Sequence, residues 1–298
     1  MSRCGQAIGL GALALALVAA RAAPAPVPPR VHSVIGVVEL SSPPGAPWRP
    51  AQVGDSLAPG AALRTGAGAR AELVLDGALA RLYEISLARL PADPAARRRI
   101  ELERGAASFD VQPDDSAPFQ VDTPGAVALA KGTRFTVTAD GELSTVSVGR
   151  GLVGVRAPES LAREVLVHPG FGVMGGAGRP FALGLLNQKG DPWETWSRGA
   201  APSRPLQRAG QGESPASADA VEAGPAGDAD VAIRILEARG PRRVQIVGTG
   251  GIDATFTRRD LSQVLRGNSA VLGPPLLATL HARGVTPSAF ARQVLDNL

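Results

Sequence analysis

Residues 130–137 read AKGTRFTV, and their pattern is that of a β-strand behind a turn. From Thr133 to Val137 every second residue falls on one face of the strand, whereas Arg134 points to the other face. Gly132 stands just before the strand, where a glycine lets the backbone turn or bulge. We therefore expect Gly132 to be structural and Arg134 to pair with a carboxylate across a sheet.

The same pattern repeats along the chain on both sides of this stretch. The chain has 36 Gly and 26 Pro in 298 residues, and 44% of it is hydrophobic but only 4% aromatic. Short strands separated by such turn residues are typical of an all-β domain, which we place at residues 34–181. Runs of period two, each closed by Gly, Pro or Asp, lie at 71–75, 100–103, 107–111, 118–122, 133–138, 143–148 and 152–155.

Residues 1–23 are predicted to be a signal peptide. Arg3 gives a positive start, residues 8–20 (IGLGALALALVAA) are apolar, and residues 20–22 form a small-x-small cleavage pattern. The apolar run is shorter than the ~20 residues that span a bilayer. We expect cleavage and a periplasmic or secreted protein without a membrane span, and an uncleaved anchor is the alternative.

Cleavage would change the chemistry open to the chain. It removes Cys4, the only cysteine, so the mature protein would have no disulfide, thiolate catalyst or cysteine-based metal site. It also removes Arg3 and Arg21 and no acid, which lowers the formal charge from +4 to +2. A near-neutral exported chain is a poor nucleic-acid binder, and we expect no nucleic-acid partner.

The C-terminal third divides into two parts. Residues 198–230 consist mostly of Ala, Gly, Pro and Ser, a composition that predicts a disordered linker. Residues 231–298 are predicted to be a small α+β tail domain. Its expected strands lie at 231–235, 244–247 and 254–256, and its expected helices lie at 260–265, 275–282 and 287–298, the last with Thr286 as N-cap and Pro287 at the first helical position.

One short motif suggests a hydrolase. Residues 54–57 read GDSL, the block that names a family of esterases in which the serine, here Ser56, attacks the ester. A serine nucleophile needs a base within hydrogen-bond reach and a group that orients the base. That family supplies both through later Gly-x-Asn-Asp and Asp-x-x-His motifs, and neither occurs near His32, His168 or His281. A GDSL-like esterase therefore remains only the less favoured alternative.

Other motifs also have structural interpretations. Residues 149–154 match G-x-G-x-x-G, but a strand follows instead of the helix that a dinucleotide needs, so we interpret the glycines as hairpin glycines. Residues 248–251 (GTGG) fit a plain turn, and Glu101 and Glu103 fit the solvent side of a strand. We expect no catalytic, cofactor-binding or metal-binding residues and no cofactor. Residues 182–197 contain Trp193 and Trp196, which form either a partner-docking anchor or, as we favour, a flap over the β core.

Several landmarks follow one another in a fixed order along the β region. They are Gly54-Asp55, Leu63-Arg-Thr-Gly66, the strand 71–75 before Asp76-Gly77, Leu102–Val111 (LERGAASFDV), Pro118–Thr123 (PFQVDT), Gly132–Val137 (GTRFTV), and Val146–Val148 with Gly151–Val155. In this order they resemble the FecR domain family, the periplasmic module of the iron-dicitrate sensor regulator. The resemblance covers roughly residues 50–175 and implies an all-β, twisted solenoid-like or sandwich-like module that binds protein, with no catalytic residues.

Two departures from the family limit what the resemblance implies. Transmembrane regulators of this family carry a cytoplasmic helical domain and a membrane helix before the module, where this sequence has a signal peptide. Residues 231–298 also show no clear match to the secretin/TonB short domain. We expect an exported, non-enzymatic FecR-domain protein that binds a protein or cell-envelope partner. A component of iron-uptake or cell-surface signalling that acts through a partner is the alternative.

Overall fold

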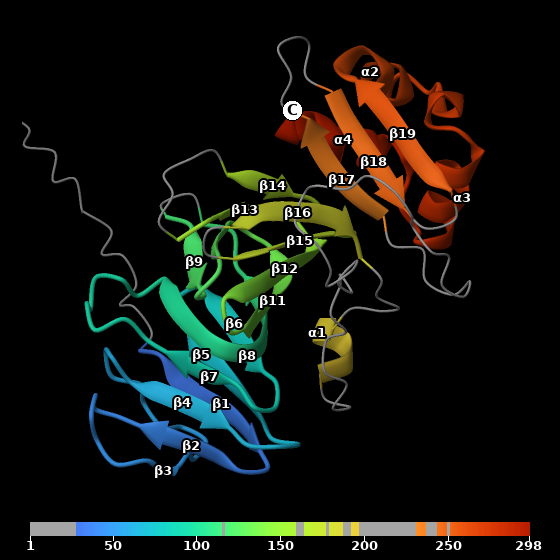
Figure 1. Ribbon diagram of the computed structural model, residues 1–298. Helices are drawn as coiled ribbons and strands as arrows, with labels where there is room; N and C mark the ends of the chain where they lie inside the picture. The colour runs from blue at the N-terminus through green and yellow to red at the C-terminus, as the bar shows by residue number, and fades with distance from the viewer. Residues whose placement is uncertain are drawn as a thin grey trace, which may run out of the picture.

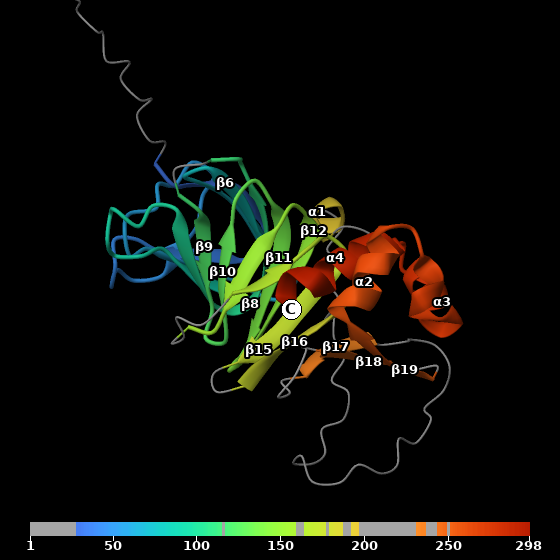
Figure 2. The same ribbon diagram turned by 90° about the horizontal axis from the view of Figure 1, so that it is seen from above.

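The computed structural model of the chain is shown in Figures 1 and 2. It describes residues 28–114, 117–158, 164–176, 179–186, 192–196, 231–236, 243–248 and 251–298. The predicted signal peptide and the predicted linker lie outside these residues. Within them, no helix has both the length and the apolar character needed to cross a membrane.

Most of the described chain forms two β-sheets, which confirms the prediction of a mainly β fold. The larger one, sheet A, is antiparallel throughout. Its strands follow one another in the order β1 (Arg30–Ile35), β5 (Arg70–Leu75), β6 (Ala78–Leu82), β8 (Arg99–Val111), β11 (Arg134–Asp140), β12 (Leu143–Arg150), β15 (Phe171–Gly176), β16 (Arg179–Leu185), β17 (Val231–Leu236), β18 (Arg243–Gly248) and β19 (Ile252–Thr257).

The smaller one, sheet B, packs against sheet A. Only its β8–β9 pair is parallel. Its strands follow in the order β3 (Arg49–Pro50), β2 (Val38–Ser41), β4 (Ala62–Thr65), β7 (Leu87–Arg89), β8, β9 (Phe119–Asp122), β10 (Val127–Ala130), β13 (Val153–Arg156) and β14 (Val165–Val167).

Strand β8 belongs to both sheets, which corrects the prediction of two separate strands at 100–103 and 107–111. Its first part pairs with β7 in sheet B, and its second part pairs with β6 and β11 in sheet A. Gly105 lies at the change of sheet with φ +91°, and a Cβ there would come within 2.5 Å of the Ser86 Cα. The glycine therefore bends the strand without ending it, which is how a strand passes between packed sheets.

The core lies between the two sheets. Phe109 and Phe135 come from neighbouring strands of sheet A and stack with ring centroids 5.2 Å apart, and Phe119 reaches Phe109 from sheet B at 5.9 Å. All three rings are at most 1% exposed. Contacts between aromatic rings add to the stabilisation from their burial.

The stretch at residues 130–137 has the predicted roles. Gly132 adopts φ +62° and packs against Pro113, so a side chain there would be strained and crowded. Phe135 and Val137 are buried on the core side of β11. Arg134 lies on the other face and pairs with Asp110, its direct neighbour on β8, at 2.9 Å.

The three predicted C-terminal helices are present, together with one short 3₁₀ helix. Thr286 caps the last helix by accepting a hydrogen bond from the Ala289 N–H, as expected from the sequence. The helices gather on one face of β17, β18 and β19 (Figure 2). They are α2 (Arg258–Leu265), η2 (Ser269–Leu272), α3 (Pro274–Ala282) and α4 (Pro287–Asn297).

The C-terminal part is built onto the β-sandwich. Strand β17 pairs with β16, so sheet A continues into residues 231–298. Phe290 of α4 is fully buried 6.4 Å from the ring of Phe171. The side chains of Gln293 and Asn297 bind the main chain of the edge strand β14, with the two amide nitrogens 2.6 and 2.8 Å from the carbonyl oxygen of Leu166. Helix α4 thus covers a sheet edge that would otherwise be open to pairing.

Candidate functional site

The outer face of sheet A carries a row of polar side chains. Glu72, Arg81, Ser108, Thr136 and Ser147 stand on five neighbouring strands, each directly opposite the next. They alternate along their strands with the buried core residues, so they point away from the sandwich interior. Even so, Glu72, Ser108, Thr136 and Ser147 are each at most 7% exposed. Buried polar groups require partners.

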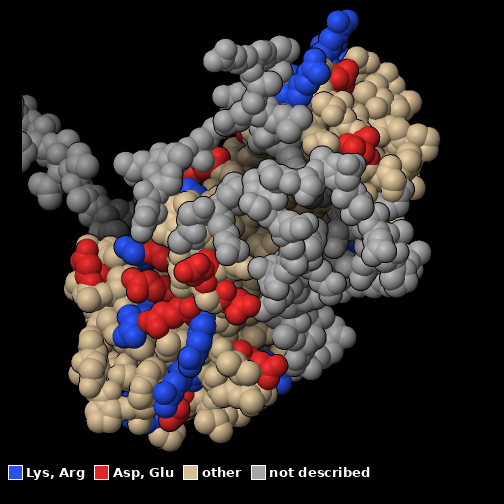
Figure 3. All heavy atoms as spheres, viewed as in Figure 1, with Lys and Arg blue, Asp and Glu red and all other residues tan. Residues whose placement is uncertain are grey.

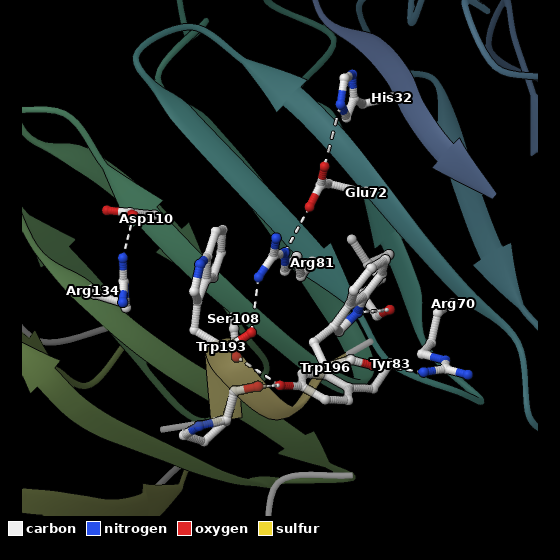
Figure 4. A network of polar contacts seen from close by, with 12 residues as sticks. His32, Arg70, Glu72, Arg81, Tyr83, Ser108, Asp110, Arg134, Trp193 and Trp196 are labelled. Atoms are coloured by element: carbon white, nitrogen blue, oxygen red, sulfur yellow. Dashed lines mark hydrogen bonds and ion pairs between the residues drawn. The ribbon is translucent and has the colours of Figure 1, made fainter. Parts of the chain in front are cut away.

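Side chains of the row satisfy one another. The Arg81 Nε donates to a Glu72 carboxylate oxygen at 2.6 Å, and the hydroxyls of Ser108 and Thr136 are 2.7 Å apart. The hydroxyl of Tyr83 lies 3.1 Å from that of Ser108. Figure 4 shows this network from close by. It fixes the Arg81 guanidinium in one position on the sheet.

Two tryptophans cover this row. Trp193 lies in α1 (Pro192–Thr195) and Trp196 follows it directly, and the single turn of α1 lies beside β8 (Figure 1). Trp193 and Trp196 are 7% and 5% exposed. The guanidinium carbon of Arg81 lies 3.9 Å from the centroid of Trp193 and 5.2 Å from that of Trp196. Arg134 reaches Trp193 at 5.4 Å. Such cation–π contacts are strongest where water is excluded.

The sheet also binds the main chain of this segment. The Tyr83 hydroxyl donates to the carbonyl oxygen of Pro192 at 2.8 Å, and Arg81 donates to that of Trp193 at 2.8 Å. Arg70 donates to the carbonyl oxygen of Trp196 at 2.6 Å. In the reverse direction, the Trp196 indole N–H donates to the Leu82 carbonyl oxygen at 3.0 Å. Strand side chains therefore bind three backbone carbonyls and two rings of one short segment.

A polar groove continues from this segment toward the C-terminal helices. It has a volume of about 250 Å³, and its lining includes Arg134, Thr136, Ser147, Pro192 and Arg283. The covered row and the groove together form a surface with hydrogen-bond donors, hydroxyls and arginines. Such a surface can bind carbonyl groups and aromatic rings of another chain, and we take it as the candidate functional site.

Ser56 lies away from this face. It forms an isolated bridge with Arg30 and lines a mainly apolar cleft of about 440 Å³. His32 lies on β1, His168 bonds to α4, and His281 is in the last turn of α3. In the part of the chain that the structure describes, none of the hydrogen bonds of these histidines reaches Ser56. None of the three is therefore placed as a general base for this serine.

The residues next to Ser56 build a turn. Gly54 adopts φ +94°, and the Asp55 carboxylate accepts hydrogen bonds from Arg49 at 2.8 and 2.9 Å and from the Gln52 N–H at 2.7 Å. These bonds hold the pKa of Asp55 below its usual range, with the Arg49 guanidinium as the main cause. The residues of the GDSL match thus form a turn that the hydrogen bonds of Asp55 stabilise.

The glycine motif at residues 149–154 differs from the prediction. Strand β12 pairs within sheet A and β13 within sheet B, so residues 149–154 carry the chain from one sheet to the other. They do not join a hairpin, and that interpretation was wrong. Gly151 makes the crossover possible with φ +84° and backbone within 3.0 Å of an added Cβ. Of the predicted turn at residues 248–251, Gly248 ends β18, and residues 249–250 lie outside the described residues. Strands β18 and β19 pair antiparallel.

Neither carboxylate clusters nor metal sites emerge from the described residues. Glu101 and Glu103 lie on the partly exposed side of β8, as predicted, and form ion pairs with Arg99 and Arg89. Among the residues that the structure describes, no group of three or more His, Cys, Asp or Glu side chains is placed to hold a metal ion.

The covered polar row was not predicted as a site from the sequence. The only available signal was the Trp-x-x-Trp spacing, because serine and threonine on alternate positions look like an ordinary solvent face.

Part of the chain is similar to known proteins. Two crystal structures of a "putative anti-sigma factor" from Parabacteroides distasonis ATCC 8503 are similar, each at 26% identity over 46% of this chain with a TM-score of 0.39. The matched part spans 65% and 64% of those chains, which is less than two thirds of their length. No curated protein matches. Residues 61–154, which run from β4 into β13, match the family described as FecR protein, and this part of the chain is therefore a FecR domain.

Proposed function

We propose that this chain is a component of cell-surface signalling, an exported and non-enzymatic FecR-domain protein that binds a protein or cell-envelope partner. The observation that carries the proposal is the FecR match at residues 61–154. Members of this family are regulatory proteins and not enzymes. The proposed location is the periplasm or the cell surface, as the predicted signal peptide indicates.

The surface charge fits a protein partner better than a nucleic acid. On the face shown in Figure 3, acidic and basic side chains are interspersed over the strands of the β region. A nucleic-acid-binding face would concentrate arginine and lysine on one side. Arginines of the described strands also form ion pairs with neighbouring acids, as Arg64 does with Glu39 and Arg89 with Glu103.

The test is recovery of the partner from the compartment that the proposal names. A tagged full-length chain is expressed in its own cells, which are fractionated after chemical cross-linking, and the mass of the mature chain is measured. We expect an exported chain that lacks about the first 23 residues and a reproducible cross-linked envelope protein. An uncleaved chain confined to the cytoplasm, or no cross-linked protein in the envelope fraction, would contradict the proposal.

The iron-uptake alternative has a separate test. If the partner relays iron-carrier uptake, the neighbouring genes should encode a sigma factor or a TonB-dependent receptor, and deletion of this gene should change transcription of that receptor under iron limitation. Unchanged transcription together with a recovered envelope partner would limit the function to envelope binding.

A further inference from the structure

We propose that the polar row under α1 is a peptide-binding site and that Pro192–Trp196 is its tethered ligand. The external partner would present the same chemistry, two tryptophans three positions apart with exposed backbone carbonyls at and before them. This inference rests on the proposed function and names the surface through which the partner binds. The chain's own segment would occupy that surface until the partner replaces it.

The first argument is the kind of contact that the face makes. Recognition of peptides combines main-chain hydrogen bonds with pockets or platforms for a few side chains. Here Tyr83, Arg81 and Arg70 bind carbonyls, while the two tryptophans provide the large buried anchors. Tryptophan and arginine are also the residues that dominate binding energy at protein interfaces. The sheet therefore binds this short segment through the kinds of contact that a protein interface makes with its partner.

The second argument is what lies beneath the tryptophans. A structural cover is needed where it removes apolar surface from water. In the polar row under α1, Arg81 bonds to Glu72, and Ser108 bonds to Thr136. Such a face is stable in water without a cover. The fold therefore does not require a cover on this face. We assign the docking of α1 to peptide recognition instead.

The third argument is the size of the segment. Helix α1 has only four residues, and an isolated helix shorter than ~12 residues is marginal in water. Its conformation therefore depends on the sheet. Because it is covalently attached, its effective concentration at the face is on the order of mM, and a free peptide must compete with it. An external ligand should bind well only when the tethered copy has been removed.

The experiment compares the full-length protein with a variant whose tethered anchors are lost, Trp193→Ala/Trp196→Ala. The probe is a fluorescently labelled, acetylated and amidated peptide of sequence PWETW, with binding followed by fluorescence polarisation. We expect the variant to bind the peptide at least ~10-fold more tightly than the wild-type chain does, because the tethered competitor is gone. A peptide with both tryptophans replaced by alanine should not bind either protein.

Controls locate the binding on the row. Adding Arg81→Ala to the double variant should lower the peptide affinity at least ~10-fold. The substitution removes the guanidinium that donates to a peptide carbonyl and that makes cation–π contacts with both tryptophan rings. Adding Arg89→Ala on sheet B, where the arginine bonds to Glu103, should leave the affinity unchanged. Circular dichroism checks that each variant is folded. If the double variant does not fold, the same comparison is made with Trp196→Ala alone.

The outcomes separate this inference from the proposed function. A folded variant that does not bind the peptide overturns the inference, and α1 is then a structural cover. If that variant and the wild type nevertheless capture the same envelope partner, the proposed function stands and the partner binds elsewhere. If the peptide binds as expected but cross-linking recovers no envelope protein, the site stands and the proposed function fails.

Discussion

Helices α1 and α4 are both held on the β-sandwich by hydrogen bonds between side chains and main chain, but in opposite directions. At α4 the helix supplies the side chains, and the amides of Gln293 and Asn297 bind the backbone of β14. At α1 most of the side chains come from sheet A and the residue after β6, and they bind carbonyls of the helix segment, while only Trp196 donates in the other direction.

The surfaces below the two helices differ as well. Helix α4 buries Phe290, Ala291 and Val294 in the hydrophobic core, at most 1% exposed, whereas α1 rests on polar groups. The comparison teaches that similar polar contacts can belong to a permanent part of the fold or to an exchangeable segment. What lies beneath those contacts decides between the two, because burial of apolar surface is the main source of stability.

The largest expected effect is the loss of the α4 anchor. Phe290→Ala should lower the free energy of unfolding by ~3–5 kcal/mol, because it leaves a cavity between α4 and Phe171. Urea unfolding followed by circular dichroism measures the loss. Arg292→Ala, an exposed position on the same helix, should change stability by less than ~0.5 kcal/mol. Equal effects of the two substitutions would show that α4 is not part of the core.

The amides of α4 should contribute the next largest effect. Gln293→Ala removes the acceptor of the His168 N–H and a donor to the Leu166 carbonyl, and it leaves partly buried backbone groups without those partners. We expect a loss of ~1–3 kcal/mol in the free energy of unfolding. Hydrogen exchange at the His168 amide should also become faster. If the rate of exchange stays the same, the edge of β14 is protected by something other than α4.

Fold and site differ in how far the sequence predicts them. Strand periodicity is local, so alternation in residues 71–75 and 133–138 predicts strands that the structure places at Arg70–Leu75 and Arg134–Asp140. The predicted partner of Arg134 also follows from this local pattern. Strand β8 was divided in the prediction, because Gly105 looks like a strand end when its neighbours in the other sheet are unknown.

The candidate site depends on contacts that no local pattern contains. Arg81 and Trp193 are 112 positions apart, and Tyr83 and Pro192 are 109 apart. Ser108 and Thr136 occupy the positions of a solvent-facing strand side, and yet both are at most 6% exposed in the structure. The sequence therefore predicts which face each side chain occupies but not what covers that face.

The tryptophans provide a smaller effect that tests the comparison most directly. In an ordinary core each Trp→Ala substitution would cost ~3–5 kcal/mol. For Trp193→Ala/Trp196→Ala together we expect a loss of at most ~1.5 kcal/mol in global stability, because undocking of α1 leaves the sandwich intact. Thermal and urea unfolding measure it. A loss of stability as large as that of Phe290→Ala would show that α1, like α4, is a permanent part of the fold.

The cap of α2 gives a pH-dependent effect on the C-terminal helices. Thr257 donates from its hydroxyl and its N–H to the Asp260 carboxylate, and these bonds hold the pKa of Asp260 below its usual value. A carboxyl with a lowered pKa stabilises the fold at neutral pH, and that contribution is lost as the pH falls through the lowered pKa of the folded state. Asp260→Asn should cost ~1 kcal/mol at pH 7, and the cost should shrink as the pH falls through that pKa.

The smallest effect should come from Arg134, at the border of the covered row. Its pair with Asp110 is partly exposed, and Arg150 bonds to the other oxygen of the same carboxylate at 2.9 Å. Arg134→Ala therefore leaves Asp110 with a partner and should cost at most ~1 kcal/mol. Gly132→Val, two residues earlier, should cost more, because φ +62° and the contact with Pro113 exclude a branched side chain. If Arg134→Ala keeps the melting temperature but weakens binding of the PWETW peptide in the tryptophan variant, Arg134 serves recognition on a strand whose other face serves the fold.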